Sequence, residues 1–319
     1  MCGFAGLVQR HPDEAAARRF RALARTSLAK RGPDDFRSET VDGVELIHAR
    51  LSIIDLAAGQ QPMIDDQGAI AFNGEVYNHA DLHLPGIPYR THSDTEVLLK
   101  GLNSKGMAFL READGMYAFA YFDRRARKLH LARDLFGIKP AYYVLKPGVF
   151  AFSSTIPALM AYSDKRINEQ GYYEFYHGRG ARGAHTLFDD VQEVAPGQVA
   201  IYDLATHTVT VETWEERRMS ALTSLSEADL IDRLDEIMNL SIQRHLVSDV
   251  PVASLLSGGI DSGLTTAIAA RYVPDLACFS IGFKDKRYDE SPYSSAIAKK
   301  YGLRHFIKMV DGEDLIGML

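Results

Sequence analysis

The sequence has few cysteines, no long apolar run and no excess of positive charge. Its 319 residues include only two cysteines, Cys2 and Cys278, so a disulfide scaffold is excluded and neither a disulfide nor a bound metal is expected. No apolar run reaches about 18 residues, so no transmembrane helix is expected. The 36 Lys and Arg residues are outnumbered by 42 Asp and Glu residues, without a long run of one sign. This balance argues against nucleic acid as a partner.

The start of the chain lacks the basic and apolar segments of a secretion signal, because a strand-like run begins directly at residue 3. We therefore expect a cytoplasmic protein without a membrane anchor. Apolar residues make up 46% and charged residues 24% of the chain, which is ordinary globular composition. At roughly 150 residues per domain, the length predicts two domains.

The first predicted domain, residues 2–212, is rich in strands with helices set apart, which predicts an α+β layered fold. Helices are expected at 13–30 and from Ser93-Asp94 onward. The run 116–122 is apolar on both faces and should lie between two layers. The expected strands are 44–48, 51–55, 69–73, 116–122, 128–132, 141–145, 149–153 and a closing hairpin of 199–202 with 209–211.

The second predicted domain, residues 213–319, alternates strand and helix signals, which predicts a parallel doubly wound α/β sheet. Ser226 and Asp229 are placed to cap a long amphipathic helix. Strands are expected at 251–256, 277–283 and 305–310, with helices from Asp261, from about Pro292 and from Gly312.

A serine- and glycine-rich turn follows the first strand of the second domain, with the sequence Ser257-Gly258-Gly259-Ile260-Asp261-Ser262. Glycines permit close backbone approach, and the N–H groups at a helix start attract a phosphate. Asp261 fits such a site if Mg²⁺ lies between the carboxylate and the phosphates. The string lacks the Gly-Lys-Ser/Thr ending of a Walker A loop. It resembles the pyrophosphate loop of the ATP pyrophosphatase family.

Cys2 is the candidate nucleophile of the first domain. If Met1 is removed, the α-amine of Cys2 can accept the thiol proton, so no catalytic histidine is required. A tetrahedral intermediate needs donors for its oxyanion, and Asn73 and Gly74 offer a side-chain amide and a backbone N–H. Arg50 and Asp94, at the ends of elements, are candidates for binding substrate charges.

Together, several strings resemble the class II glutamine amidotransferase domain, an N-terminal-nucleophile (Ntn) hydrolase with a four-layer αββα fold. Followed by the pyrophosphate loop, they are similar in order to the glutamine-dependent asparagine synthetase family, with a second, Rossmann-like half. The matching strings are Cys2-Gly3, Arg31-Gly32-Pro33-Asp34, residues 48–55, residues 73–78, Ser93-Asp94-Thr95-Glu96, residues 114–120 and residues 133–140.

The resemblance implies a carbon–nitrogen ligase that uses glutamine as amido donor. Cys2 would attack the glutamine amide, Asn73 and Gly74 would hold the oxyanion, Arg50 the α-carboxylate and Asp94 the α-amino group. Ammonia would then amidate β-aspartyl-AMP made from aspartate and ATP with Mg²⁺, without a tightly bound cofactor, in a homodimer. The pocket would also include Leu51, Ser52, Ile53, Ile54 and Glu75; Leu255 and Ile281 would contact adenosine, and Ser257, Gly258, Gly259, Asp261 and Ser262 the phosphates.

The family's later Ser-Gly-Glu-Gly-x-Asp-Glu segment is absent, and three strands are fewer than the five or six usual for such a sheet. We therefore expect an incomplete synthetase half and a chain that at best hydrolyses glutamine. Two alternatives stay open: a β-lactam-synthetase-like relative, and a non-catalytic dimerising or regulatory remnant. A retained Met1 would favour the remnant, and the amide acceptor and oligomeric state are not determined by the sequence.

Overall fold

The computed structural model describes residues 1–178, 180, 183–216 and 225–311. The chain divides into two compact units, Met1–Met219 and Ser220–Leu319, each with apolar clusters of its own.

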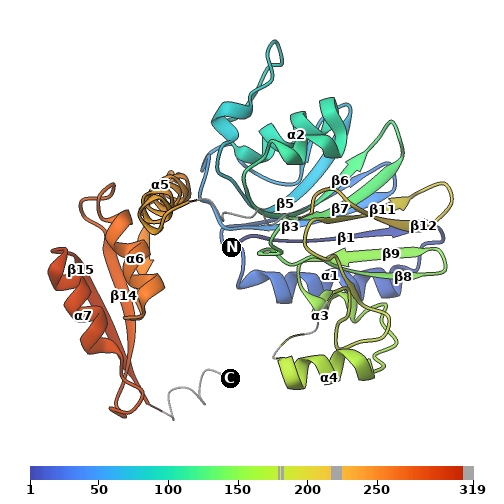
Figure 1. Cartoon of the computed structure of the whole chain (residues 1–319). Helices are drawn as coiled ribbons and strands as arrows, with labels where there is room; N and C mark the ends of the chain where they lie inside the picture. Colours follow the sequence, from blue (N-terminus) through green and yellow to red (C-terminus); the bar gives the residue numbers. More distant parts are fainter. Residues whose placement is uncertain (179, 181–182, 217–224, 312–319) are drawn as a thin grey trace. The chain divides into compact units, whose positions relative to one another are not determined.

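The first unit contains two six-stranded antiparallel sheets stacked on each other (Figure 1). One sheet has the order β10-β8-β9-β1-β3-β2, and the other has the order β12-β11-β7-β6-β5-β4. The strands of the first sheet are β1 (Gly3–Gln9), β2 (Asp35–Val41), β3 (Val44–Arg50), β8 (Tyr142–Lys146), β9 (Val149–Ser153) and β10 (Gln192–Glu193). Those of the second are β4 (Met63–Ile64), β5 (Gly68–Val76), β6 (Gly115–Asp123), β7 (Lys128–Arg133), β11 (Gln198–Asp203) and β12 (Thr208–Thr213).

Helices cover the outer faces of both sheets, which confirms the predicted four-layer αββα fold (Figure 1). The first sheet packs on α1 (Glu14–Ala29) and α3 (Ile156–Leu159), and the second packs on α2 (Asp94–Lys105). Three apolar clusters fill the spaces between the four layers. The remaining helical segments of this unit are α4 (Glu169–Gly178) and the 3₁₀ helices His79–Leu82 and Gly106–Arg111.

Strand β6 is buried on both faces, as its sequence predicts. Ala118 and Ala120 belong to the cluster between the two sheets, whereas Tyr117 and Phe119 belong to the cluster under α2. The predicted hairpin is confirmed as β11 and β12, which pair antiparallel. The apolar run was sufficient to predict β6 because both faces of this strand are packed within its own unit.

The expected strand at 51–55 is wrong, because residues 51–62 form a loop. The guanidinium of Arg50 binds the backbone carbonyls of Ile54, Asp55 and Leu56, so the chain turns around this side chain. Asp55 adopts a φ of 52°, which is incompatible with a strand. The polar strand β2 was missed because it lies at the edge of its sheet and none of its residues is buried.

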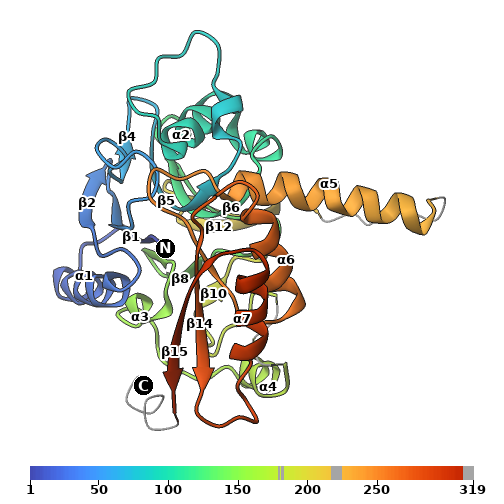
Figure 2. The same ribbon diagram turned by 90° about the vertical axis from the view of Figure 1, so that its left-hand side faces the viewer.

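The second unit contains a three-stranded parallel sheet, β13 (Ala253–Leu255), β14 (Ala277–Phe283) and β15 (Arg304–Val310), as predicted. Helices α6 (Ile260–Ala269) and α7 (Ser291–Lys300) pack on one face of this sheet (Figure 2). Ser254 bonds Thr266 of α6 and Cys278 packs on Ala298 of α7, so both helices share that face. Phe279 and Ile281 lie on the other face, 45% and 62% exposed; Phe279 stacks on Phe306 of β15, and no described helix of this unit covers them.

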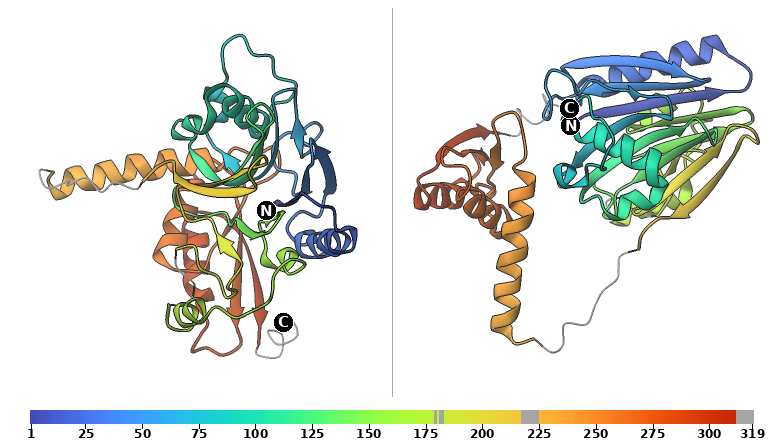
Figure 3. Two further views of the ribbon diagram at one scale, coloured as in Figure 1. Left: turned by 90° about the vertical axis from the view of Figure 1, so that its right-hand side faces the viewer. Right: turned by 90° about the horizontal axis from the view of Figure 1, so that it is seen from above.

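Helix α5 (Glu227–His245) begins with the predicted capping box of Ser226 and Asp229 and packs on α6 (Figure 3). Ile242 is its buried contact, while Leu234 and Ile237 remain half-exposed. The helix expected from Gly312 lies outside the described residues. Among the described helices, none is long and apolar enough to span a membrane.

Candidate active site

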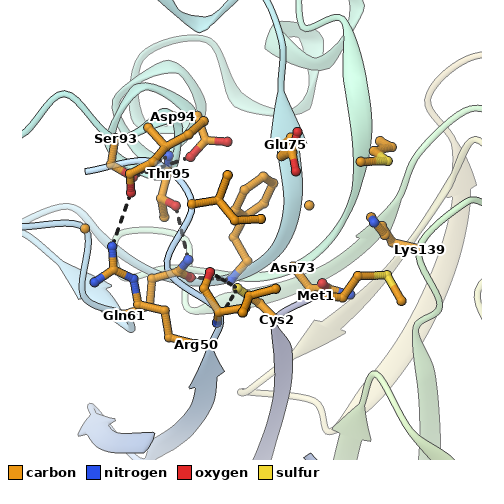
Figure 4. Close-up of a pocket in the computed structure, with 17 residues that line it drawn as sticks. Met1, Cys2, Arg50, Gln61, Asn73, Glu75, Ser93, Asp94, Thr95 and Lys139 are labelled. Atoms are coloured by element: carbon orange, nitrogen blue, oxygen red, sulfur yellow. Dashed lines mark hydrogen bonds between the residues drawn. The ribbon is translucent and has the colours of Figure 1, made fainter. Parts of the chain in front are cut away.

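Most of the residues predicted for the glutamine site line one pocket of the first unit (Figure 4). Arg50, Ser93 and Asp94 lie towards one end of this pocket and Met1 and Lys139 towards the other, with Cys2 and Asn73 between them. Ser52 is the exception, because it does not line the pocket and its N–H donates to Asp34 Oδ2 at 2.7 Å. The predicted residues that line the pocket are Cys2, Arg50, Leu51, Ile53, Ile54, Asn73, Gly74, Glu75 and Asp94.

Cys2 directly precedes β1, and its thiol faces the loop after β3. Its Sγ accepts a hydrogen bond from Leu51 N–H at 3.3 Å, and Arg31 Nε donates to the carbonyl oxygen of Cys2 at 3.0 Å. Burial raises the pKa of the Cys2 thiol and lowers the pKa of the α-amine of Met1. The thiol therefore needs a base to ionise, and an amine at this end of the chain favours its neutral, proton-accepting form.

The edge of β5 forms the wall opposite Cys2, because β4 pairs only with Ala69 and Ile70 and then ends. Beyond that point, Phe72 N–H donates to Gln61 Oε1 at 2.7 Å and Val76 N–H donates to Asp94 Oδ2 at 3.1 Å.

Gly74 lies midway between these two residues on the strand, so its N–H points to the same edge. Its partner on β6, Tyr117, bonds Asp134 with both its N–H and its carbonyl, so Gly74 is not bonded across this pair. Within the described part of the chain, the N–H of Gly74 has no hydrogen-bond partner and is open to the pocket.

Asn73 is 1% exposed, and neither its amide oxygen nor its amide nitrogen has a hydrogen-bond partner among the described residues. A buried amide without partners is costly unless a ligand completes it. Gly74 has no room for a side chain, because a Cβ there would lie 2.2 Å from the carbonyl oxygen of Met116. Two hydrogen-bond donors thus share the pocket with the Cys2 thiol, one from a side chain and one from the backbone.

Arg50 ends β3 and is 5% exposed, with its guanidinium in the pocket. Hydrogen bonds to the carbonyls of Ile54 and Asp55, at 3.2 and 2.6 Å, orient it. A side chain at position 59 has no room, because a Cβ there would lie 2.8 Å from the carbonyl oxygen of Asp55 and 2.6 Å from the guanidinium. A guanidinium held in this way offers a preorganised partner for a carboxylate.

Asp94 is the first residue of α2, where Ser93 acts as the N-cap through a hydrogen bond from Thr95 N–H at 3.2 Å. Burial raises the pKa of Asp94, and the hydrogen bond from Val76 N–H opposes this shift. A cationic ligand group beside this carboxylate would stabilise its ionised form.

Sequence reasoning missed Gln61, Thr95 and Lys139 as lining residues, along with Met1, Gly59, Phe72, Ser93 and Met116. Thr95 and Lys139 lie within the strings that carried the resemblance, but Gln61 had no sequence signal. Lys139 reaches the pocket because Asp134 accepts hydrogen bonds from the N–H groups of Ile138 and Lys139, both at 3.0 Å. Burial lowers the pKa of Lys139.

In the second unit, a pocket on the open face of the sheet is lined by Leu255, Ser257 and Ile281, three of the predicted ATP contacts. The other four, Gly258, Gly259, Asp261 and Ser262, lie in the adjoining turn and do not line this pocket. Gly258 adopts a φ of 96°, and Gly259 is the N-cap of α6. The hydroxyls of Ser257 and Ser262 lie 2.9 Å apart and close the turn.

The described residues contain no group of three or more His, Cys, Asp or Glu side chains that could hold a metal ion. The exposed Asp261, in the first turn of α6, is the one carboxylate of the predicted phosphate set. A single carboxylate fits a Mg²⁺ ion that is bound mainly through phosphates.

The family models match both units. Residues 1–215 match the glutamine amidotransferase domain, and residues 233–319 match asparagine synthase. The chain therefore belongs to the glutamine amidotransferase domain family. Within its second unit, residues 233–319 match the asparagine synthase family.

The chain is also similar to individual relatives. The chain is 31% identical to asparagine synthetase (glutamine-hydrolyzing) 1 of Bacillus subtilis, covering 100% of this chain and 52% of the relative. It is 29% identical to asparagine synthetase (glutamine-hydrolyzing) 3 of the same organism, covering 100% and 56%. The chain thus spans about half the length of the curated relatives it matches. A solved glutamine phosphoribosylpyrophosphate amidotransferase of B. subtilis aligns with a TM-score of 0.45 at 17% identity, covering 96% of this chain and 65% of that chain.

Proposed function

We propose that the first unit is a glutaminase that uses Cys2 as its nucleophile. The observation that carries this proposal is the buried amide of Asn73, which lies without a partner among the described residues beside the open N–H of Gly74 and in the same pocket as the Cys2 thiol. Donors aimed at the place where negative charge develops are the requirement for acyl transfer.

Glutamine fits the pocket with its charged end towards Arg50 and Asp94, which bind the α-carboxylate and the α-amino group. Leu51, Ile53, Ile54 and Glu75 line the space around its side chain. Its side-chain amide then lies at Cys2. The backbone of Ser52 belongs to the same loop, although its side chain does not line the pocket.

The reaction follows from these positions once Met1 has been removed. The α-amine of Cys2 accepts the thiol proton while Sγ attacks the side-chain carbonyl carbon of glutamine, and Asn73 and Gly74 bind the resulting oxyanion. Collapse of this intermediate breaks the C–N bond, and the departing ammonia takes the proton from the amine. Water then attacks the thioester, the amine accepts its proton, and glutamate leaves as the thiol forms again.

For the whole protein, we propose glutamine-dependent asparagine synthesis, supported by the names of the relatives and the match of residues 233–319. ATP with Mg²⁺ would bind at Leu255, Ile281 and the turn 257–262, and aspartate would be activated as β-aspartyl-AMP for attack by ammonia. We further expect the whole protein to be cytoplasmic and to form a homodimer.

The test is to incubate the whole chain with glutamine, aspartate, ATP and Mg²⁺ and to measure glutamate, asparagine and pyrophosphate separately. Glutamate release from a chain whose mass corresponds to loss of Met1 supports the glutaminase. Stoichiometric asparagine and pyrophosphate would extend the proposal to the synthetase, and glutamate alone would restrict it to the first unit. A retained Met1 with no glutamate release would contradict the proposal and favour a non-catalytic remnant.

A further inference from the structure

Gln61 connects the strand that carries the oxyanion donors to the helix that carries Asp94. Its Oε1 accepts the hydrogen bond from Phe72 N–H at 2.7 Å, and its Nε2 donates to Thr95 Oγ1 at 3.1 Å. The orientation of the amide is determined by chemistry, since a backbone N–H can only donate and must face the oxygen. Gln61 is 5% exposed and Thr95 2% exposed, so water does not compete for either bond.

The bond to Phe72 occupies a position that a neighbouring strand would otherwise fill. Strand β4 ends before Phe72, and on the same edge the carbonyl of Phe72 lies 3.0 Å from His48 Nε2, on β3 of the other sheet. Both polar groups of Phe72 are therefore held by side chains. The next residue along the chain is Asn73, and Gly74 follows.

The placement of Asn73 and Gly74 therefore depends on side chains that do not touch the reacting atoms. Asn73 has no side-chain bonds of its own among the described residues, so its amide is aimed by its backbone and by packing. The backbone on its N-terminal side is held at Phe72, and Val76, two residues beyond Gly74, is held by Asp94. Gln61 and Asp94 thus bind the backbone two residues before and two residues after Gly74.

We propose that Gln61 is a positioning residue for the oxyanion donors Asn73 and Gly74, a role that rests on the proposed glutaminase function. Through Thr95, it also keeps these donors in register with Asp94, which neighbours Thr95 at the start of α2. The charged end of one glutamine molecule is thereby matched to Asp94, and its reacting carbonyl to the oxyanion donors beside it.

This role predicts an effect on the transition state rather than on substrate binding. Loss of one oxyanion donor costs about a hundredfold to a thousandfold in kcat, and a displaced donor should cost less. Gln61→Met keeps the length of the side chain and removes both hydrogen bonds. We expect kcat for glutamate release to fall by about tenfold to a hundredfold, with KM for glutamine within about threefold of wild type.

The experiment compares Gln61→Met with Gln60→Met in the whole chain. Gln60 is the preceding residue; among the described residues its amide bonds Ala57 O, and it does not line the pocket. Each variant is measured for kcat, KM and the rate of Cys2 alkylation by iodoacetamide, which needs no oxyanion donor. Thr95→Val removes the acceptor of Gln61 Nε2, and Thr95→Ser, which keeps the hydroxyl, should retain more of kcat.

Combination with Asn73→Ala separates positioning from a general structural role. If Gln61 acts through Asn73, the loss caused by Gln61→Met becomes smaller in the Asn73→Ala background. An undiminished loss in that background, a kcat within threefold of wild type, or parallel changes in KM and alkylation rate would each overturn the inference. A wild-type chain without glutaminase activity would overturn the proposed function and this role together, whereas an active wild type with an unaffected Gln61→Met would overturn only the role.

Discussion

Strands β6 and β14 are the central apolar strands of the two units, but only β6 is covered on both faces. Tyr117, Phe119 and their neighbours are buried beneath α2 or between the sheets. In β14 the small residues Cys278 and Ser280 face the helices, whereas Phe279 and Ile281 lie on the face that no described helix of this unit covers. The two units therefore place their candidate sites in different surroundings.

The difference in burial determines how strongly the hydrogen-bonding groups of each candidate site can bind a ligand. In the first unit, buried polar groups such as the Gln61 amide are bound by named partners, whereas both polar atoms of the Asn73 amide lack a partner among the described residues. Arg31, His48 and His130 each leave a single buried atom without such a partner. In the second unit, the serine hydroxyls of the phosphate turn bond each other and remain accessible to water. A buried donor gives more electrostatic stabilisation than an exposed one, because water does not screen it.

The largest effect on glutamate release is expected from substitution of Cys2, and substitution of Cys278 is the matched comparison in the second unit. Cys2→Ala should lower glutamate release by about 10⁴-fold or more, because no other group replaces the nucleophile. Cys278→Ala should keep the wild-type rate, since Cys278 is fully buried within the second unit. A glutamine-like electrophile should label Cys2 and spare Cys278, as checked by peptide mass spectrometry. A Cys2→Ala variant at the wild-type rate would refute the assignment.

The contrast between covered and open faces is tested by Phe119→Ala and Phe279→Ala. Phe119 is 0% exposed and Phe279 45% exposed. We expect Phe119→Ala to lower the free energy of unfolding of its unit by about 3–5 kcal/mol, and Phe279→Ala to lower it by about 1 kcal/mol. Urea titrations followed by hydrogen exchange in peptides of each unit measure the two values. Equal losses would mean that the face carrying Phe279 is covered in solution.

Acid should destabilise the first unit through the buried His48 and the partly buried His130. Burial lowers the pKa of His48 and of His130 to about 4 each. Between about pH 6.5 and pH 4 the unfolded chain binds protons that the folded unit does not, so stability falls as pH falls, by up to about 3 kcal/mol per histidine.

This pH effect is measured by urea unfolding at pH 7 and pH 5. His130→Phe, which keeps a ring beside Tyr121, should shrink the loss between the two pH values. The exposed His11 is the control position, and His11→Phe should leave the loss unchanged. The attribution fails if His130→Phe and wild type lose the same stability.

The smallest effect concerns recognition of the glutamine α-carboxylate. Arg50→Lys keeps the charge but loses the planar fork, so KM for glutamine should rise about tenfold to a hundredfold. Because Arg50 also holds the loop 51–62, the melting temperature is measured alongside KM. Arg124→Lys, at a surface ion pair with Asp42, is the control. Unchanged KM in Arg50→Lys would remove Arg50 from substrate binding.

Much of the fold followed from local patterns in the sequence. The capping box at Ser226, the alternating elements of the second unit and the two-faced apolar run of β6 were predicted and are present. The strand expected at 51–55 failed because its apolar residues line a pocket instead of a core, and because the Arg50 side chain bonds carbonyls four to six residues further along and turns the chain. The polar edge strand β2 had no periodicity to detect.

The sequence by itself determined which residues can carry the chemistry, because Cys2, Asn73, Gly74, Arg50 and Asp94 occur in recognisable strings. Only the tertiary structure decided how the donors at the site are directed. Among the described residues, the N–H of Gly74 has no partner because it points to the edge of β5 that β4 leaves unpaired beyond Ile70. The role of Gln61 follows only from its hydrogen bonds to Phe72 and Thr95, which are 23 residues apart in the chain. Such placements depend on strand pairing and packing between distant segments, which no local pattern encodes.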